Sequence, residues 1–345
     1  MSERIIEGTV LTGSSLRPIE GRLVIEDGRI ISIEEAPVSS ESIICPAFIN
    51  AHTHIGDSVA KDAGSALTVE ALFAPPDGLK HQILRNTDPD ELVEAMARSL
   101  SYMQGLGTGA CYDFREGGRE GVELFRQAAQ GLDIDALAFG RGDPSVLEIA
   151  DGYGASGAAD GEFEPARNAA LAADKPFGIH AGEVDSGDIN PALDLAPDFV
   201  VHMVHAESLH MDRLEDMDVP VVVCPRSNLI TGVGHPPIEA LSERTTVALG
   251  TDNVMINNPS MFREMAITVK VLGISAQEAL QMATVNAASI LDRPDGVIEV
   301  DLPARIVILD GDSDNLSGTV DPVNAVATRA CHADIDEVLL PPIET

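Results

Sequence analysis

The chain has 345 residues, of which 44% are hydrophobic, and a mean hydropathy of +0.08, values that allow a large core and exclude global disorder. No run of about 18 apolar residues occurs, and Met1-Ser2-Glu3-Arg4 does not begin a signal peptide, so we expect a cytoplasmic protein without a membrane span. The formal net charge of -34 disfavours binding to nucleic acid or to anionic membranes.

Three residue counts are unusual. The 56 acidic residues are spread along the chain against 22 basic ones, which predicts a halophilic protein whose self-repulsion is screened in a salt-rich cytosol; an acidic mesophilic protein is the alternative. Only four lysines occur, at positions 61, 80, 175 and 270. The cysteines form no CxxC pair, which favours buried free thiols at Cys45, Cys111, Cys224 and Cys331.

Both ends of the chain contain short strand-like runs. Near the N-terminus, Arg22–Ile25 and Arg29–Ile33 flank Asp27-Gly28, which is a hairpin signal. Near the C-terminus, strand-like runs occupy residues 296–300, 304–309 and 325–328. We therefore predict that residues 1–45 and 295–345 join in one small β-sandwich domain, and that residues 46–294 form a larger domain inserted between them.

In the middle of the chain, strand-like runs alternate with helix-like segments, which favours a parallel sheet. After the strand that ends at His54, further strands are predicted at 108–113, 136–139, 146–149, 177–179, 199–204, 219–224 and 246–249. Helices are predicted over 88–103, 121–130 and 165–173, and a last amphipathic helix over 275–291. Eight strands predict an α/β fold of the (β/α)8 TIM-barrel type, whose active site lies at the C-terminal strand ends.

Potential metal ligands fall at these predicted strand ends. His52 and His54 are two residues apart on a strand and therefore face the same side. His180 ends the fifth strand, His202 lies in the sixth, and Asp252 follows the eighth. A zinc or iron ion held by imidazoles and a carboxylate, with one position open for water, is typical of a hydrolytic site. We therefore predict that His52, His54, His180 and Asp252 bind one divalent metal ion.

Catalytic roles follow for three residues near this metal site. Asp252 suits the abstraction of a proton from water, Glu183 could protonate a substrate nitrogen, and His202 could hold the water or a developing oxyanion. Each has a simpler explanation, such as a helix cap for Asp252 or a solvated loop acid for Glu183, but their conjunction favours the site.

His81, His210 and His332 are expected at the surface, and His235 in a loop that could touch substrate.

A possible cofactor motif occurs at Gly152–Gly157, which matches GxGxxG. A dinucleotide site needs a helix opening directly from the glycines, whereas Gly161 interrupts the segment that follows. We therefore expect a mobile loop over the barrel mouth.

Several segments resemble motifs of the amidohydrolase superfamily, and within it the chlorohydrolase and cytosine-deaminase-like group of metal-dependent hydrolases. The resemblance covers most of the chain and rests on residues 44–54, 180–183, 201–205, 224–228, 250–253 and 279–288. It implies a (β/α)8 barrel with a flanking β-sandwich, one zinc or iron ion on the four ligands named above, and catalytic roles for Glu183, His202 and Asp252. Relatives with two metals use a lysine on the fourth strand, and the strand predicted here has none.

The sequence departs from the family pattern in two places. The region between His54 and the helix at 88, which often lines the substrate pocket in relatives, is short, and Ala47 stands where the family usually has glycine. The residues and the resemblance together predict deamination of a cyclic amidine, as in a nucleobase, nucleoside or pterin-like ring. Hydrolysis of a cyclic amide or imide, or of a halogenated ring, is the alternative, and a non-catalytic barrel subunit is a remote one.

Substrate contacts are predicted for polar residues that follow the second, seventh and eighth strands: Arg115, Arg226, Asn228 and Asn253. Each could instead have a structural role. The expected partner is a small molecule, and assembly into a homo-oligomer is left open.

Overall fold

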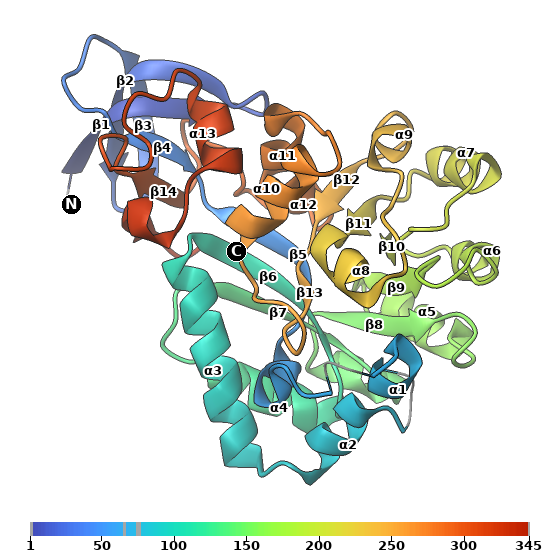
Figure 1. The fold of residues 1–345 in the computed structure, drawn as a ribbon. Coiled ribbons are helices and arrows are strands. Elements are labelled where there is room, and N and C mark those ends of the chain that lie inside the picture. The colour runs from blue at the N-terminus through green and yellow to red at the C-terminus, as the bar shows by residue number, and fades with distance from the viewer. Residues whose placement is uncertain (1–2, 65–66, 74–76, 344–345) are drawn as a thin grey trace.

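The computed structural model describes residues 3–64, 67–73 and 77–343, so the outermost residues of the predicted terminal domain lie outside it. The two ends of the chain lie side by side, blue and red in Figure 1, and form one six-stranded sheet. Its order is β15 (Ile335–Leu339), β14 (Ile306–Leu309), β4 (Ile43–Pro46), β1 (Glu3–Thr12), β2 (Arg17–Glu26) and β3 (Arg29–Glu35). The predicted hairpin at Asp27-Gly28 is confirmed, because β2 and β3 pair antiparallel on either side of it.

Two predicted C-terminal strands are wrong. Residues 325–328 belong to α13 (Pro322–Thr328), because Asp321 caps a helix start by accepting hydrogen bonds from the backbone N–H groups of Val323 and Asn324. Residues 296–300 have no regular structure, although Ile298 is fully buried. In both segments the apolar run reflects burial, which does not by itself distinguish a strand from other buried structure.

The larger part is a closed parallel barrel. Its sheet contains β5 (Phe48–His54), β6 (Thr108–Arg115), β7 (Asp135–Gly140), β8 (Gly152–Gly157), β9 (Phe177–Ala181), β10 (Phe199–His202), β11 (Val221–Val223), β12 (Val247–Leu249) and β13 (Asp252–Asn253). The two edge strands, β12 and β13, are separated only by Gly250-Thr251, so they act as one interrupted eighth strand that closes the circle. Asn50 on β5 connects the two ends of the sheet. Its side chain donates a hydrogen bond to the Thr251 hydroxyl group at 2.7 Å and accepts one from the Thr251 backbone N–H group at 2.9 Å. This confirms the (β/α)8 prediction.

Helices follow most of the barrel strands: α3 (Pro89–Gly105), α4 (Gly118–Ala128), α5 (Glu164–Ala172), α6 (Ile189–Asp194), α7 (Ser208–Met217), α8 (Pro225–Thr231), α9 (Ile238–Ser242) and α10 (Met261–Lys270). The three helices predicted over 88–130 and 165–173 correspond to α3, α4 and α5. The helix predicted over 275–291 is divided into α11 (Ala276–Met282) and α12 (Val285–Ser289), because the Ala283 carbonyl accepts a hydrogen bond from Ile49 of β5. The helices not yet named are η1 (Ile55–Ala60), α1 (Val69–Phe73), α2 (Leu79–Asn86), η2 (Pro144–Glu148) and η3 (His332–Asp334).

The fourth barrel strand lies elsewhere than predicted. Residues 146–149 fall largely in the short helix η2, and the strand is β8, the glycine-rich stretch interpreted from sequence as a mobile loop. Large aromatic rings from neighbouring strands fill the barrel, and a Cβ on Gly154 would lie 2.7 Å from the ring of Phe114. A Cβ on Gly152 would lie 2.6 Å from Phe139. The glycines therefore make room for the core, and β8 also contains no lysine.

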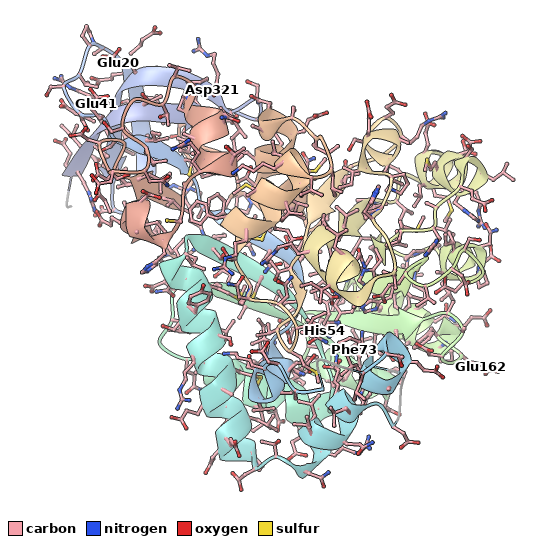
Figure 2. The ribbon with its side chains drawn as sticks, in the orientation of Figure 1. Glu20, Glu41, His54, Phe73, Glu162 and Asp321 are labelled. Carbon is pink, nitrogen blue, oxygen red and sulfur yellow. The ribbon has the colours of Figure 1, made fainter. Side chains whose placement is uncertain are left out.

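The acidic residues lie largely at the surface, and the cysteines lie mostly in the interior. In Figure 2, the exposed acids Glu20, Glu41, Glu162 and Asp321 extend from the periphery, whereas His54 lies in the interior. All four cysteines are free, and three are buried as predicted, but Cys331 is exposed. Within the described ranges, no helix is long and apolar enough to cross a membrane.

Candidate active site

The predicted metal and catalytic side chains come together at the C-terminal end of the barrel. His52 and His54 end β5, His180 lies near the end of β9, His202 ends β10 and Asp252 begins β13. Every residue of β5 is buried, because one face packs in the barrel and the other meets the surrounding helices. The strands therefore place these five side chains without help from the longer loops.

Four of these side chains face one another through atoms that can bind a metal. His52 Nε2 lies 3.2 Å from His180 Nε2 and 3.3 Å from Asp252 Oδ1, and His54 Nε2 lies 3.5 Å from the same oxygen. Ligand atoms on a tetrahedral zinc ion, each bound at its usual distance, are about 3.4 Å apart. These distances suit one first-row divalent ion. Among the described residues, two groups of potential ligands share His52: one adds His54 and His180, and the other adds His202 and Asp252.

The protonation states of the four residues also suit a metal. Burial lowers the pKa of His52 to about 4, and it lowers the pKa values of His54 and His180 well below the usual value, so the imidazoles are neutral. Burial alone would raise the pKa of Asp252, but its hydrogen bond with His52 and the neighbouring imidazoles hold it well below the usual value. Neutral imidazole and carboxylate are the forms that bind metals.

Backbone carbonyls orient two of the imidazoles. His180 Nδ1 lies 2.8 Å from the carbonyl oxygen of Ala155, and His54 Nδ1 lies 3.1 Å from that of Phe114. A hydrogen bond donated by Nδ1 fixes the proton there and leaves Nε2 with its lone pair directed at the cluster. The outer contacts of the two rings thus support metal binding through Nε2.

His202 and Glu183 lie beside this cluster. His202 Nε2 is 3.5 Å from Glu183 Oε2, and His202 Nδ1 is 3.1 Å from the side-chain nitrogen of Asn228. Burial raises the pKa of Glu183, with His202 opposing the shift, so this carboxyl group holds its proton to a higher pH than usual. His202 and Asp252 have backbone φ angles of 79° and 58°, a left-handed conformation that costs about 1–3 kcal/mol in non-glycine residues and is concentrated at functional sites.

The first turn of α8 holds two of these groups. Ser227 donates a hydrogen bond of 2.5 Å to Asp252 Oδ2, and the next residue, Asn228, contacts His202. Arg226 does not line the cavity, because its guanidinium group is paired with the buried Glu264 at 2.6 Å. Asn253 does line it. Of the substrate contacts predicted on this side, the structure brings Asn253 to the cavity wall and Asn228 to His202.

Arg115, the remaining predicted substrate contact, lies in a buried ion-pair network behind the cavity. Its guanidinium group is 3.3 Å from Asp113 Oδ2 and 2.7 Å from Glu116 Oε2. Glu116 is the centre of the network, since its Oε1 is also 2.7 Å from Lys80 Nζ, 3.3 Å from Arg141 Nη1 and 3.2 Å from His54 Nδ1. The network therefore connects a candidate metal ligand to α2.

A cavity of about 1030 Å3 opens over the cluster. Its wall includes His54, His180, Glu183, His202, Asp252 and Asn253 from the barrel, and Thr68, Glu70, Phe73, Lys80 and His81 from the short region after β5. His81 was predicted at the surface but lines this cavity and faces the Phe73 carbonyl at 3.1 Å. His210 is also buried, where it accepts a hydrogen bond from the backbone of Glu207 at the start of α7, whereas His332 is exposed as predicted.

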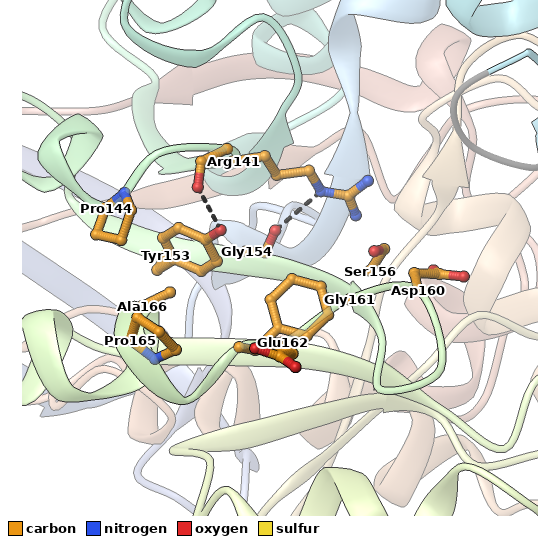
Figure 3. Close-up of a pocket in the computed structure, with 12 residues that line it drawn as sticks. Arg141, Pro144, Tyr153, Gly154, Ser156, Asp160, Gly161, Glu162, Pro165 and Ala166 are labelled. Atoms are coloured by element: carbon orange, nitrogen blue, oxygen red, sulfur yellow. Dashed lines mark hydrogen bonds between the residues drawn. The ribbon is translucent and has the colours of Figure 1, made fainter.

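A second hollow of about 390 Å3 lies beside the main cavity and shares Arg141, Ser156 and Asp160 with it (Figure 3). Arg141 donates from Nε to the Gly154 carbonyl at 2.9 Å, and Tyr153 donates to the Gly142 carbonyl at 2.8 Å. Arg141 Nη1 also lies 3.3 Å from Glu116 Oε1, and its Nη2 lies 3.3 Å from His180 Nδ1, so the guanidinium group is already committed to partners in the protein.

Sequence reasoning missed Lys80, Glu116, Arg141 and Ser227. Glu116 and Arg141 directly follow β6 and β7, so their position after a strand was an available signal. Lys80 lies on a short helix in a region with no clear pattern, and its only distinguishing feature was the rarity of lysine in this chain.

A barrel with imidazole and carboxylate side chains at its C-terminal strand ends is an arrangement typical of metal-dependent hydrolases. A model of the amidohydrolase family matches residues 43–340, and the chain belongs to this family. It is therefore an amidohydrolase-type enzyme, and its buried histidine and aspartate cluster suits a divalent metal ion.

Named relatives share most of its length. The chain is 36% identical to a protein of Methanothermobacter thermautotrophicus named "Putative aminohydrolase", over 95% of both chains. It is 26% identical to a 5-methylthioadenosine/S-adenosylhomocysteine deaminase of Haloquadratum walsbyi, over 89% of this chain and 84% of the relative. A zinc-bound adenosine deaminase from Xanthomonas campestris has the same fold, with a TM-score of 0.82 at 19% identity, over 98% of this chain and 91% of that one.

Proposed function

We propose that the protein is an aminohydrolase that deaminates a cyclic amidine in a nucleobase, nucleoside or pterin-like ring and releases ammonia. The observation that carries this proposal is Glu183, a carboxyl group of raised pKa that lies 3.5 Å from His202 in the cavity over the four-donor cluster. Addition of water to a C=N carbon needs a proton on the ring nitrogen, and a carboxyl group of raised pKa can supply it. The names of the two relatives support the same reaction class.

The four donors His52, His54, His180 and Asp252 would hold one zinc or iron ion. When bound, that ion would supply Lewis acidity and lower the pKa of a water molecule. Asp252, held by Ser227 through Oδ2, would accept a proton from the water and return it to the leaving amine. His202, held by Asn228, would orient the water and the developing oxyanion. Glu183 would protonate the ring nitrogen as the water oxygen adds to the ring carbon. The C–N bond would break once Asp252 has protonated the amine, so ammonia leaves, and the remaining hydroxyl proton would return to Glu183 as the carbonyl group forms.

A screen for ammonia release tests this function. The purified protein, loaded with zinc or iron and kept in molar salt, is given purines, pyrimidines, pterins and their nucleosides, with a cyclic imide and a halogenated triazine as comparison substrates. We expect ammonia from at least one of the amidine rings. Hydrolysis of only the imide or the triazine would instead assign the alternative reaction to the same site.

Two matched variants identify the proton donor. Glu183→Gln keeps the size of the side chain but cannot donate a proton from a carboxyl group, so we expect kcat to fall by about 100-fold or more while bound metal is retained. Glu41→Gln removes an exposed acid from the terminal sheet and serves as the control. Full activity in Glu183→Gln would contradict the assignment.

A further inference from the structure

One buried charged residue in the wall of the main cavity has no part in the proposed mechanism. Lys80 lies on α2 and is only 4% exposed, yet it lines the same cavity as His54, Glu183 and His202. It is one of four lysines in the chain. The cost of burying an ammonium group makes such a position uncommon unless the charge is paired.

Two carboxylates account for the charge of Lys80. Its Nζ lies 3.0 Å from Asp57 Oδ2 and 2.7 Å from Glu116 Oε1, and neither acid belongs to the cavity lining. Both partners therefore lie behind the ammonium group as seen from the cavity. An ammonium group has three N–H donors, so one remains for a molecule in the cavity.

The surrounding charges decide what that donor can bind. The buried network contains three acids, Asp57, Asp113 and Glu116, and three cations, Lys80, Arg115 and Arg141, so it has no surplus positive charge. The cavity wall further contains the acids Glu70, Asp160, Asp185 and Asp188. Among the described residues of the wall, Lys80 and Arg141 are the permanent cations, and Arg141 is committed to Glu116 and the Gly154 carbonyl.

We propose that Lys80 is a specificity-determining residue that donates a hydrogen bond to a neutral acceptor of the substrate, either a carbonyl or hydroxyl oxygen or a ring nitrogen. The same arrangement rejects anionic substituents such as a phosphate group, because no uncommitted cation faces them and the acids repel them. The inference rests on the proposed function, and it explains how the short region after His54, which departs from the family pattern, contributes to substrate choice.

The test uses the best substrate from the ammonia-release screen, a set of its analogues that each lack one acceptor atom, and its phosphorylated form. Lys80→Met removes the donors at similar length, and Lys80→Arg retains charge and donors. Lys175→Met is the matched control, because Lys175 also has internal partners, the carbonyls of Leu147 and Ala150 at 2.6 Å, but does not line the cavity.

We expect Lys80→Met to lower kcat/KM by about 10- to 100-fold, mainly through KM, with metal content unchanged. With the wild-type enzyme, the analogue that lacks the acceptor of Lys80 should have a kcat/KM lower than that of the parent substrate by the same factor. Lys80→Met should not lower the kcat/KM of this analogue any further. Lys80→Arg should retain part of the activity towards the parent substrate. The phosphorylated form should be a poorer substrate than its parent. If Lys80→Met does not fold, Asp57→Asn/Lys80→Met removes the unpaired carboxylate and is measured instead.

Two results would overturn the role of Lys80. One is an equal loss for the parent and every analogue, which would mean that Lys80 acts only through Glu116 and the fold. The other is a preference for the phosphorylated substrate. Absence of ammonia release by the wild type from every ring would overturn the proposed function and this role with it, so the two failures are distinguishable.

Discussion

The two walls of the cavity are built in different ways. On the metal side, the candidate ligands lie on β5, β9 and β13, whose positions are fixed by continuous parallel pairing around the barrel. On the other side, η1, α1 and α2 are short helices without a sheet, packed by a small apolar cluster that includes Ala60, Leu72 and Met255. Lys80 ties this second wall to the barrel through Glu116, at the end of β6.

We infer from this difference that the barrel wall serves catalysis and that the helical wall serves substrate selection. Strand register places metal ligands to within a fraction of an ångström, which a catalytic ion requires. Short helices on loops can vary in length and sequence without disturbing that register, so they are suited to substrate choice. Changes on the metal side should therefore remove metal and activity together, and changes in the second wall should alter KM while metal remains bound.

The largest effect is expected from His54→Ala. It removes one of the four proposed donors from a buried cluster, so metal affinity should fall by more than about 100-fold and activity with it. Metal content measured by mass spectrometry, with circular dichroism as a check of folding, tests this. His332→Ala, at an exposed position, is the control. A full complement of metal in His54→Ala would contradict the proposed ligand set.

Glu116→Gln is expected to have the next largest effect, because Glu116 is where the two walls meet. The substitution removes the negative charge that contacts His54, Lys80 and Arg141, and loss of such an outer partner of a metal ligand typically costs about 10- to 100-fold in metal affinity. Competition with a chelator measures this affinity. Glu120→Gln, an exposed acid on α4, is the control. If metal affinity does not change, the network serves only the second wall.

The metal side was accessible from sequence for the same reason that it is rigid. Alternation on a strand places His52 and His54 together, and the ends of parallel strands meet, so strand assignment and the family resemblance together predicted the ligand set. The prediction from sequence was wrong where side-chain packing, and not the local sequence pattern, determines the secondary structure. Gly152–Gly157 forms a strand because the rings of Phe114 and Phe139 leave no room for a Cβ, and a single sequence does not reveal which rings will lie opposite.

The second wall was inaccessible for a different reason. Lys80 is near His54 only because a short chain folds back and an ion pair forms with Glu116, which lies 36 positions further along. Arg115 and Arg226 illustrate the opposite case, since both follow strands yet are bound to buried acids within the protein. Position directly after a strand predicts that a side chain is near the site. The charges around that side chain decide whether it faces the cavity or pairs with another residue inside the protein.

Leu72→Ala tests whether the second wall affects only substrate binding. Leu72 is 5% exposed, and loss of a buried leucine side chain costs about 2–5 kcal/mol of packing in a well-formed core. We expect faster hydrogen exchange within η1, α1 and α2 and a KM raised several-fold, with metal affinity unchanged. Leu209→Ala, at an exposed position on α7, is the control. Loss of metal in Leu72→Ala would show that the two walls fold as one unit.

Salt should produce the smallest effect, and one that again separates buried from exposed groups. The net charge of -34 is carried largely by exposed acids, whose mutual repulsion is screened within about 10 Å at 0.1 M salt and within about 3 Å at 1 M. Melting temperature should therefore rise by several degrees from low to molar potassium chloride, whereas metal affinity should change little, because the ligand cluster is buried and screened far less. A melting temperature that does not rise would contradict the salt adaptation inferred from composition. A metal affinity that follows the salt would place the cluster in closer contact with solvent than the burial of His52 and His54 indicates.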